Sequence, residues 1–94
     1  MIRINWQDIY WIQAEGNYCS VVTIDKRFAV KTSLKKFLSK LPLPHFMQIH
    51  KAYIVNIRSI EKIDLKDSVV IIDGNYLPFG RIYRDTLLQQ LEII

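Results

Sequence analysis

The hydrophobic positions of this chain recur mostly with the period of a β-strand. Ile2 and Ile4 alternate with polar residues and predict a short N-terminal strand, and residues 9–12 form an apolar run of β-branched and aromatic residues. Gly16-Asn17 follows as a turn signal. Similar short segments predict further strands at 18–24, 28–31, 47–49, 53–56, 60–65, 69–72 and 76–79.

Two segments have helical spacing instead. Apolar residues at i, i+3, i+4 and i+7 predict an internal helix that begins at Leu34, and Thr32 or Ser33 can cap its start. Pro42 ends it, because proline lacks the backbone donor that a helix needs. Leucines that share one face predict a closing helix over 81–91.

The turn signals between the predicted strands favour antiparallel pairing. Asp73-Gly74-Asn75 is a tight hairpin turn, and Asp25-Lys26-Arg27 is a polar hairpin tip. Pro78 predicts an edge strand, because proline cannot donate to a β-ladder. The pattern as a whole predicts a mainly β, antiparallel domain with one short internal helix and a C-terminal helix.

Composition narrows the class of protein. The 94 residues suit one domain, and 50% hydrophobic with 23% charged residues is a globular composition. A net charge of +4 favours nucleic acid, an anionic membrane surface or an acidic protein as partner. The single cysteine excludes an internal disulfide and a cysteine-rich zinc site, so we expect a reducing, cytoplasmic compartment. No apolar run approaches the roughly 20 residues of a membrane helix.

The segment 46–56 carries the most informative chemistry. It places His50 and Lys51 between two apolar β segments, where a basic pair can reach an anionic group. The sequence contains no glycine-rich phosphate loop, no nucleophile with a base and an orienting group, and no set of metal ligands at suitable spacing. We therefore predict a binding protein without a cofactor or metal, and not an enzyme.

The segments, in this order, resemble the LytTR DNA-binding domain, the output module of many bacterial response regulators. The resemblance covers residues 1–94 and implies an elongated stack of small antiparallel sheets. It also implies sequence-specific binding of double-stranded DNA by loops that enter successive major grooves, with two copies on direct repeats, and an upstream receiver domain in a longer regulator. The matching residues are Asp8–Ala14, Gly16–Tyr18, Ser33-Leu34, Leu41-Pro42, Phe46, Ile49–Asn56, Ile60, Leu77–Arg81 and Tyr83.

The resemblance implies base contacts from three places. An arginine at position 81 can bridge O6 and N7 of guanine with two hydrogen bonds; the alternative is a solvated arginine, or one paired with Asp85. Lys51 suits a guanine edge or a phosphate, and without the resemblance it would be read as an ordinary surface lysine. The implied base-contacting residues are Asn17, Cys19, Ser20, Lys51 and Arg81.

Other polar residues have weaker assignments. His50 fits a phosphate contact and a structural role equally well. Asn56 is read first as a turn or buried amide, and Tyr18, Trp6 and Trp11 as packing residues. Exposed cations can neutralise phosphates without reading sequence. The predicted phosphate contacts are Lys35, Lys36, His50, Arg58, Lys62 and Arg84.

A protein-interaction module is the alternative from another class. Exposed edge strands would pair with a strand of the partner, and the basic loops would meet an acidic patch. RNA binding is less favoured, because exposed aromatic residues that could stack on bases are not evident.

Overall fold

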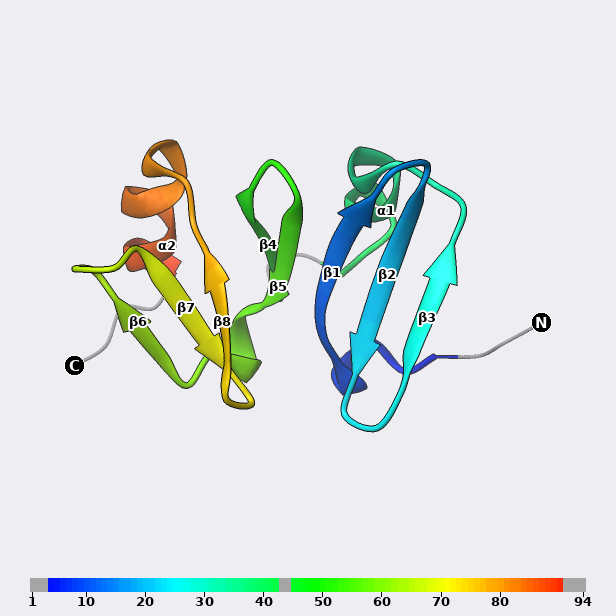
Figure 1. Ribbon diagram of the computed structural model, residues 1–94, viewed down its shortest axis with the longest axis horizontal. Coiled ribbons are helices and arrows are strands. Elements are labelled where there is room, and N and C mark those ends of the chain that lie inside the picture. The colour runs from blue at the N-terminus through cyan, green and yellow to red at the C-terminus, as the bar shows by residue number, and fades with distance from the viewer. Residues whose placement is uncertain (1–3, 43–44, 91–94) are drawn as a thin grey trace.

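Eight short strands form two antiparallel sheets in the part of the chain that the computed structural model describes, residues 4–42 and 45–90 (Figure 1). The larger sheet has the order β3-β2-β1-β5-β4, and the smaller has the order β6-β7-β8. The molecule is elongated, with extents of 40 × 23 × 23 Å. The strands are β1 (Ile9–Glu15), β2 (Tyr18–Thr23), β3 (Arg27–Val30), β4 (Phe46–His50), β5 (Tyr53–Asn56), β6 (Lys62–Asp64), β7 (Val69–Ile72) and β8 (Asn75–Pro78).

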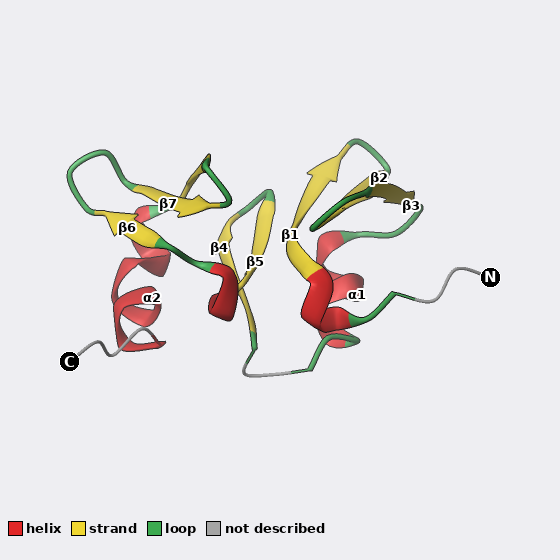
Figure 2. Ribbon diagram, turned by 90° about the horizontal axis from the view of Figure 1, so that it is seen from below, coloured by secondary structure: helices red, strands yellow, loops and turns green. Residues whose placement is uncertain are grey.

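Two short α-helices lie along the same side of the molecule in Figure 2, each packed against a different face of the larger sheet. The internal helix α1 (Leu34–Ser39) is capped by Ser33, whose hydroxyl oxygen accepts a hydrogen bond from the Lys36 N–H at 3.1 Å. The predicted closing helix is divided into a 3-10 turn, η3 (Arg81–Tyr83), and helix α2 (Arg84–Gln90). Two further 3-10 turns are η1 (Trp6–Asp8) and η2 (Ile57–Ser59).

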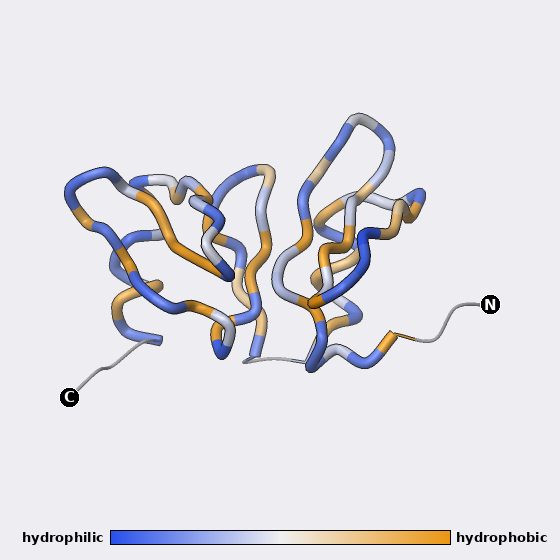
Figure 3. Tube along the Cα trace, turned by 60° about the horizontal axis from the view of Figure 1, so that its bottom comes forward, coloured by the Kyte–Doolittle hydropathy of each residue, from blue (hydrophilic) through white to orange (hydrophobic). Residues whose placement is uncertain are grey.

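The larger sheet is buried on both faces, which the side-chain alternation of its central strands explains. Trp11 pairs with Val55 and faces one core, while Ile12 pairs with Ile54 and faces the other. Figure 3 shows hydrophobic residues mainly within the strands and hydrophilic residues at most of the turns.

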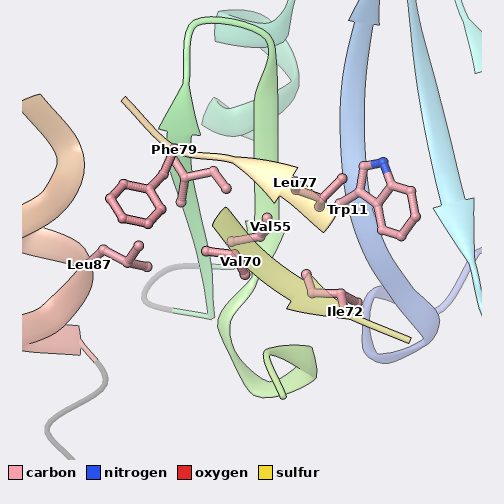
Figure 4. Packing of buried hydrophobic residues seen from close by; sticks show 8 residues of the cluster. Trp11, Val55, Val70, Ile72, Leu77, Phe79 and Leu87 are labelled. Atoms are coloured by element: carbon pink, nitrogen blue, oxygen red, sulfur yellow. The ribbon is translucent and has the colours of Figure 1, made fainter. Parts of the chain in front are cut away.

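The first core joins the two sheets and α2. It contains Trp11 of β1 and Val55 of β5, packed against residues of β7, β8 and α2 (Figure 4). The second core lies between the larger sheet and α1. Burial of the side chains of the first core holds the smaller sheet against the larger one. The first core consists of Trp11, Ile49, Val55, Val70, Ile72, Leu77, Phe79 and Leu87, and the second of Ile9, Ile12, Cys19, Val21, Leu34, Phe46 and Ile54.

Most predicted elements are confirmed, including the edge position of β8 with its Pro78. The N-terminal strand is wrong where it can be checked: residues 4–5 form no strand, and residues 2–3 lie outside the described ranges. Tyr18 is also corrected, because its side chain is 47% exposed. Trp11 is a core residue, and the Trp6 ring stacks on His45 with centroids 4.5 Å apart.

Candidate nucleic-acid interface

Three loops lie next to one another along one long side of the molecule because backbone hydrogen bonds join them. The Ala14 N–H, beside the β1–β2 turn, donates to the Ala52 carbonyl of the β4–β5 turn at 2.8 Å. The Gly80 N–H, just after β8, donates to the Ile49 carbonyl at the end of β4 at 2.7 Å. We call this the loop end; in Figure 1 its turns lie along the top. It comprises these three loops, residues 16–17, 51–52 and 79–81, together with the neighbouring β3–α1 loop, residues 31–33.

The β1–β2 turn forms the first part of the loop end. Gly16 has a φ of +61°, which glycine adopts without steric cost, and the side chain of Asn17 beside it is exposed. An open hollow separates this turn from the β3–α1 loop, and both Asn17 and Lys31 line it. The buried Cys19 thiol donates to the Thr32 carbonyl at 3.3 Å, which fixes the second loop against β2.

The β4–β5 turn presents Lys51 on a braced support. The Ala52 N–H donates to Nδ1 of His50 at 3.1 Å, so the neutral ring carries its proton on Nε2. The Gln48 amide donates to the His50 carbonyl at 3.1 Å, and the Tyr53 ring packs edge-on against the histidine at 5.5 Å. The structural role of His50 is thereby established, and Lys51 is exposed at the tip.

Arg81 follows the third loop, where η3 begins. The Gly80 contact with Ile49 places Arg81 beside the end of β4, so Arg81 and Lys51 lie at the same end of the molecule. The Arg81 side chain is exposed and, among the described residues, forms no ion pair, with Asp85 or any other carboxylate. Its guanidinium is therefore free to meet an external group.

Cys19 and Ser20 are not available as base contacts, and both predictions are corrected. Their side chains are 0% and 2% exposed, and Cys19 packs in the core between the larger sheet and α1. Burial also raises the pKa of the Cys19 thiol, which keeps it neutral. Asn17 is the exposed polar side chain that remains from the first predicted contact region.

Arg58 and Lys62 are also corrected, because they lie at the opposite end of the molecule. The Asn56 side chain donates to the Ile9 carbonyl and accepts from the Arg58 N–H, which places Arg58 near the start of β1. The loop end lies at the other end of this strand. Lys62 pairs with Ile71, two residues before the β7–β8 turn, which Figure 1 shows at the bottom. Both residues therefore lie apart from the loop end.

The far end is rich in carboxylates. The pKa of Tyr10 is raised, first by burial and then by the negative charges of Asp73 and Glu61. These two carboxylates therefore lie near the beginning of β1, where Asp8 precedes it. We define the far end as η1, η2, the β2–β3 and β7–β8 turns, Glu61 and Lys62. Its carboxylates are those of Asp8, Asp25, Glu61 and Asp73.

The other predicted phosphate contacts keep suitable positions, and two cations escaped prediction. Lys35 and Lys36 are exposed in the first turn of α1, and Arg84 is exposed at the start of α2. The missed residues are Lys31, in the β3–α1 loop, and Lys66, in the β6–β7 turn. A hydrogen bond from the Phe79 N–H to the Ser68 carbonyl at 3.0 Å connects this turn to the end of β8. The two lysines lie in loops near opposite ends of the long axis of the molecule (Figure 1), and nothing in their local sequence marked them as candidates.

The described residues hold no group of three or more side chains suited to binding a metal ion. Neither helix within residues 4–42 and 45–90 has the length and hydrophobicity needed to cross a membrane.

Comparison with known proteins agrees with this geometry. The chain is 29% identical to the sensory transduction protein LytR of Streptococcus agalactiae, over 96% of this chain and 38% of the relative. It is 26% identical to the sensory transduction protein LytT of Bacillus subtilis, over 99% of this chain and 40% of the relative. The chain therefore spans about two fifths of the length of these curated relatives.

A solved structure has the same fold. The LytTr DNA-binding domain of a response regulator from Bacillus cereus matches with a TM-score of 0.86 at 23% identity, covering 98% of this chain and 88% of that one. A sequence model of the LytTr DNA-binding domain matches residues 1–92. This family is a DNA-binding one and not a family of enzymes. The chain belongs to the LytTr DNA-binding domain family.

Proposed function

We propose that this domain recognises a specific sequence of double-stranded DNA through its loop end, as the output module of a bacterial transcription regulator. The observation that carries the proposal is the joining of the three loops by main-chain hydrogen bonds, with Lys51 and Arg81 exposed at the same end. The far end balances its four carboxylates against the cations Lys26, Arg58 and Lys62, whereas the loop end holds Lys31, Lys51 and Arg81 and no carboxylate, so a polyanion is attracted more strongly to the loop end.

The side chains divide into two roles. Arg81 forms paired hydrogen bonds with a guanine, and Lys51 and Asn17 contact base edges from the neighbouring loops. The remaining cations of this side neutralise phosphates, which supplies affinity without sequence preference. The proposed phosphate contacts are Lys31, Lys35, Lys36, His50, Lys66 and Arg84.

The dimensions suit contact with successive major grooves. The long axis of the domain is 40 Å, comparable to the roughly 34 Å of one turn of B-form DNA. The β1–β2 turn belongs to the larger sheet and Arg81 follows the smaller one, so the two loops are spaced along this axis. In this arrangement each loop enters one groove, and the β4–β5 turn lies between them.

The proposal is tested by selecting bound duplexes from a random pool and then comparing two arginine variants. Arg81→Ala should weaken binding to the selected site about 5- to 150-fold, equivalent to about 1–3 kcal/mol, and relax the preference at one base pair. Arg58→Ala removes the same charge from the far end and should change the affinity less than about threefold.

Two results would contradict the proposal. If Arg81→Ala weakened binding to all duplexes equally, the arginine would not be a base contact. If the domain retarded no duplex at physiological salt and the pool yielded no common sequence, the protein-interaction alternative would replace DNA recognition.

The proposal extends to assembly. Two copies bind direct repeats in the same orientation, and the domain forms part of a longer response regulator with an upstream receiver domain. The chain spans only 38% and 40% of its LytR and LytT relatives, which supports the second point. A recovered pair of repeats, together with the mass of the complex on DNA, would test the first point; a single half-site bound by one copy would refute it.

A further inference from the structure

Ile82 is the most exposed of the large hydrophobic residues in the described part of the chain. Its side chain is 83% exposed, compared with 68% for Tyr76 and 65% for Ile24. It follows Arg81 directly in the turn η3. Single exposed apolar residues are common on protein surfaces, so exposure alone assigns no role. The location of this residue is what requires an explanation.

The turn that carries Ile82 is held firmly. The Gly80 N–H donates to Ile49 at 2.7 Å, and the Tyr83 N–H donates to the Gly80 carbonyl at 3.0 Å. The Tyr83 ring packs closely on Gly80, since a methyl group added there would meet the ring at 3.3 Å. Ile82 is thus an exposed apolar residue on a rigid turn, next to Arg81 in the chain and at the end that carries Lys51.

Major-groove chemistry offers one apolar partner. The edges of the four base pairs present hydrogen-bond donors and acceptors, and only thymine adds a methyl group, at C5. An aliphatic side chain next to a guanine-reading arginine can therefore distinguish a neighbouring thymine by covering that methyl group.

We propose that Ile82 is a further specificity residue, which contacts the C5 methyl group of a thymine next to the base pair read by Arg81. This inference rests on the proposed function and deepens it. It assigns to the β8–η3 loop two adjacent readers of different chemistry, one charged and one apolar.

The test replaces each thymine of the selected site singly with deoxyuridine, which lacks only the methyl group, and measures the dissociation constant by fluorescence anisotropy. At one thymine, within about two base pairs of the position that Arg81→Ala relaxes, uracil should weaken binding of the unmodified domain about fourfold, the value for burial of one methyl group. Ile82→Ala should bind the thymine and uracil duplexes equally at that position.

Ile24→Ala provides the matched control. Ile24 is exposed at the far end, where its N–H donates to the Asp8 carbonyl, so its truncation should leave the fourfold difference unchanged. If no thymine near the Arg81-dependent base pair responds to uracil, or if Ile82→Ala keeps the difference, the inference is wrong while DNA recognition stands. If no sequence is selected at all, the proposed function fails and the inference fails with it.

Discussion

Truncation of Asn56 should be among the most damaging single changes to stability. The side chain is 2% exposed; its amide donates to the Ile9 carbonyl at 2.9 Å and its oxygen accepts from the Arg58 N–H at 3.1 Å. These bonds connect the start of β1 to the segment that leads from the larger sheet to the smaller one. Asn56→Ala removes both and leaves buried polar groups without their partner.

The magnitude follows from the two bonds. Each contributes about 1 kcal/mol, and an unpartnered buried group costs about 1–3 kcal/mol, so we expect a loss of about 2–4 kcal/mol in the free energy of unfolding. This is a large share of the roughly 5–15 kcal/mol typical of a domain, and corresponds to a fall in Tm of about 10–25 °C. Urea titration followed by circular dichroism measures the change directly.

Asn75→Ala is the matched control. That side chain also makes two hydrogen bonds, by donating to the carbonyls of Ile72 at 3.2 Å and Asp73 at 3.0 Å, but its residue is exposed and water can replace both bonds. We expect a loss below about 1 kcal/mol. Equal losses in the two variants would refute the reasoning, because burial would then contribute nothing to the role of Asn56.

Three further predictions concern the loop end, the thiol and a turn. Lys31→Ala should lower the slope of log affinity against log salt by about 1, whereas Lys26→Ala at the far end should not change it, as titrations at several salt concentrations would reveal. Because burial raises the pKa of Cys19, the thiol of the unfolded chain ionises at a lower pH than the thiol of the folded domain. The contribution of the neutral thiol to the free energy of unfolding is therefore complete below about pH 8.5, the ordinary thiol pKa, and declines above it. Cys19→Ala should flatten that decline in unfolding measurements between about pH 8 and pH 9.5. Gly74→Ala should cost about 1 kcal/mol in urea titrations because φ is +76° there, although nothing lies within 4 Å to clash.

Local sequence patterns were sufficient for most of the fold. The strands β5 and β7 have the predicted bounds, because short β-branched runs between turn residues leave little choice of register. Asp73-Gly74 forms the predicted tight turn, with φ of +48° and +76°. The strand predicted over 60–65 is shorter, since only Lys62–Asp64 find partners in β7. Pairing partners are a tertiary property that the pattern of one segment does not contain.

The site was less predictable, for the same reason. Cys19 and Ser20 lie close to an exposed turn in sequence, but both side chains are buried, that of Cys19 in the core beneath α1. Arg58 resembles any surface arginine until the direction of β5 is known. The loop of Lys31 is held by the bond from the Cys19 thiol to the Thr32 carbonyl, and the turn of Lys66 by the bond from the Phe79 N–H to the Ser68 carbonyl, and neither contact can be read from a local pattern. The sequence shows which residues are charged, but the position of each charge on the surface depends on how the strands are connected and paired.

The bonds from Ala14 to Ala52 and from Gly80 to Ile49 use main-chain atoms alone. Mutation can therefore exchange the recognition side chains while the spacing of the loops is inherited unchanged. Evolution of a new operator preference then needs few substitutions and no rearrangement of the framework. Regulators with this fold should differ in the bases that they favour far more than in the distance between the base pairs that their loops contact.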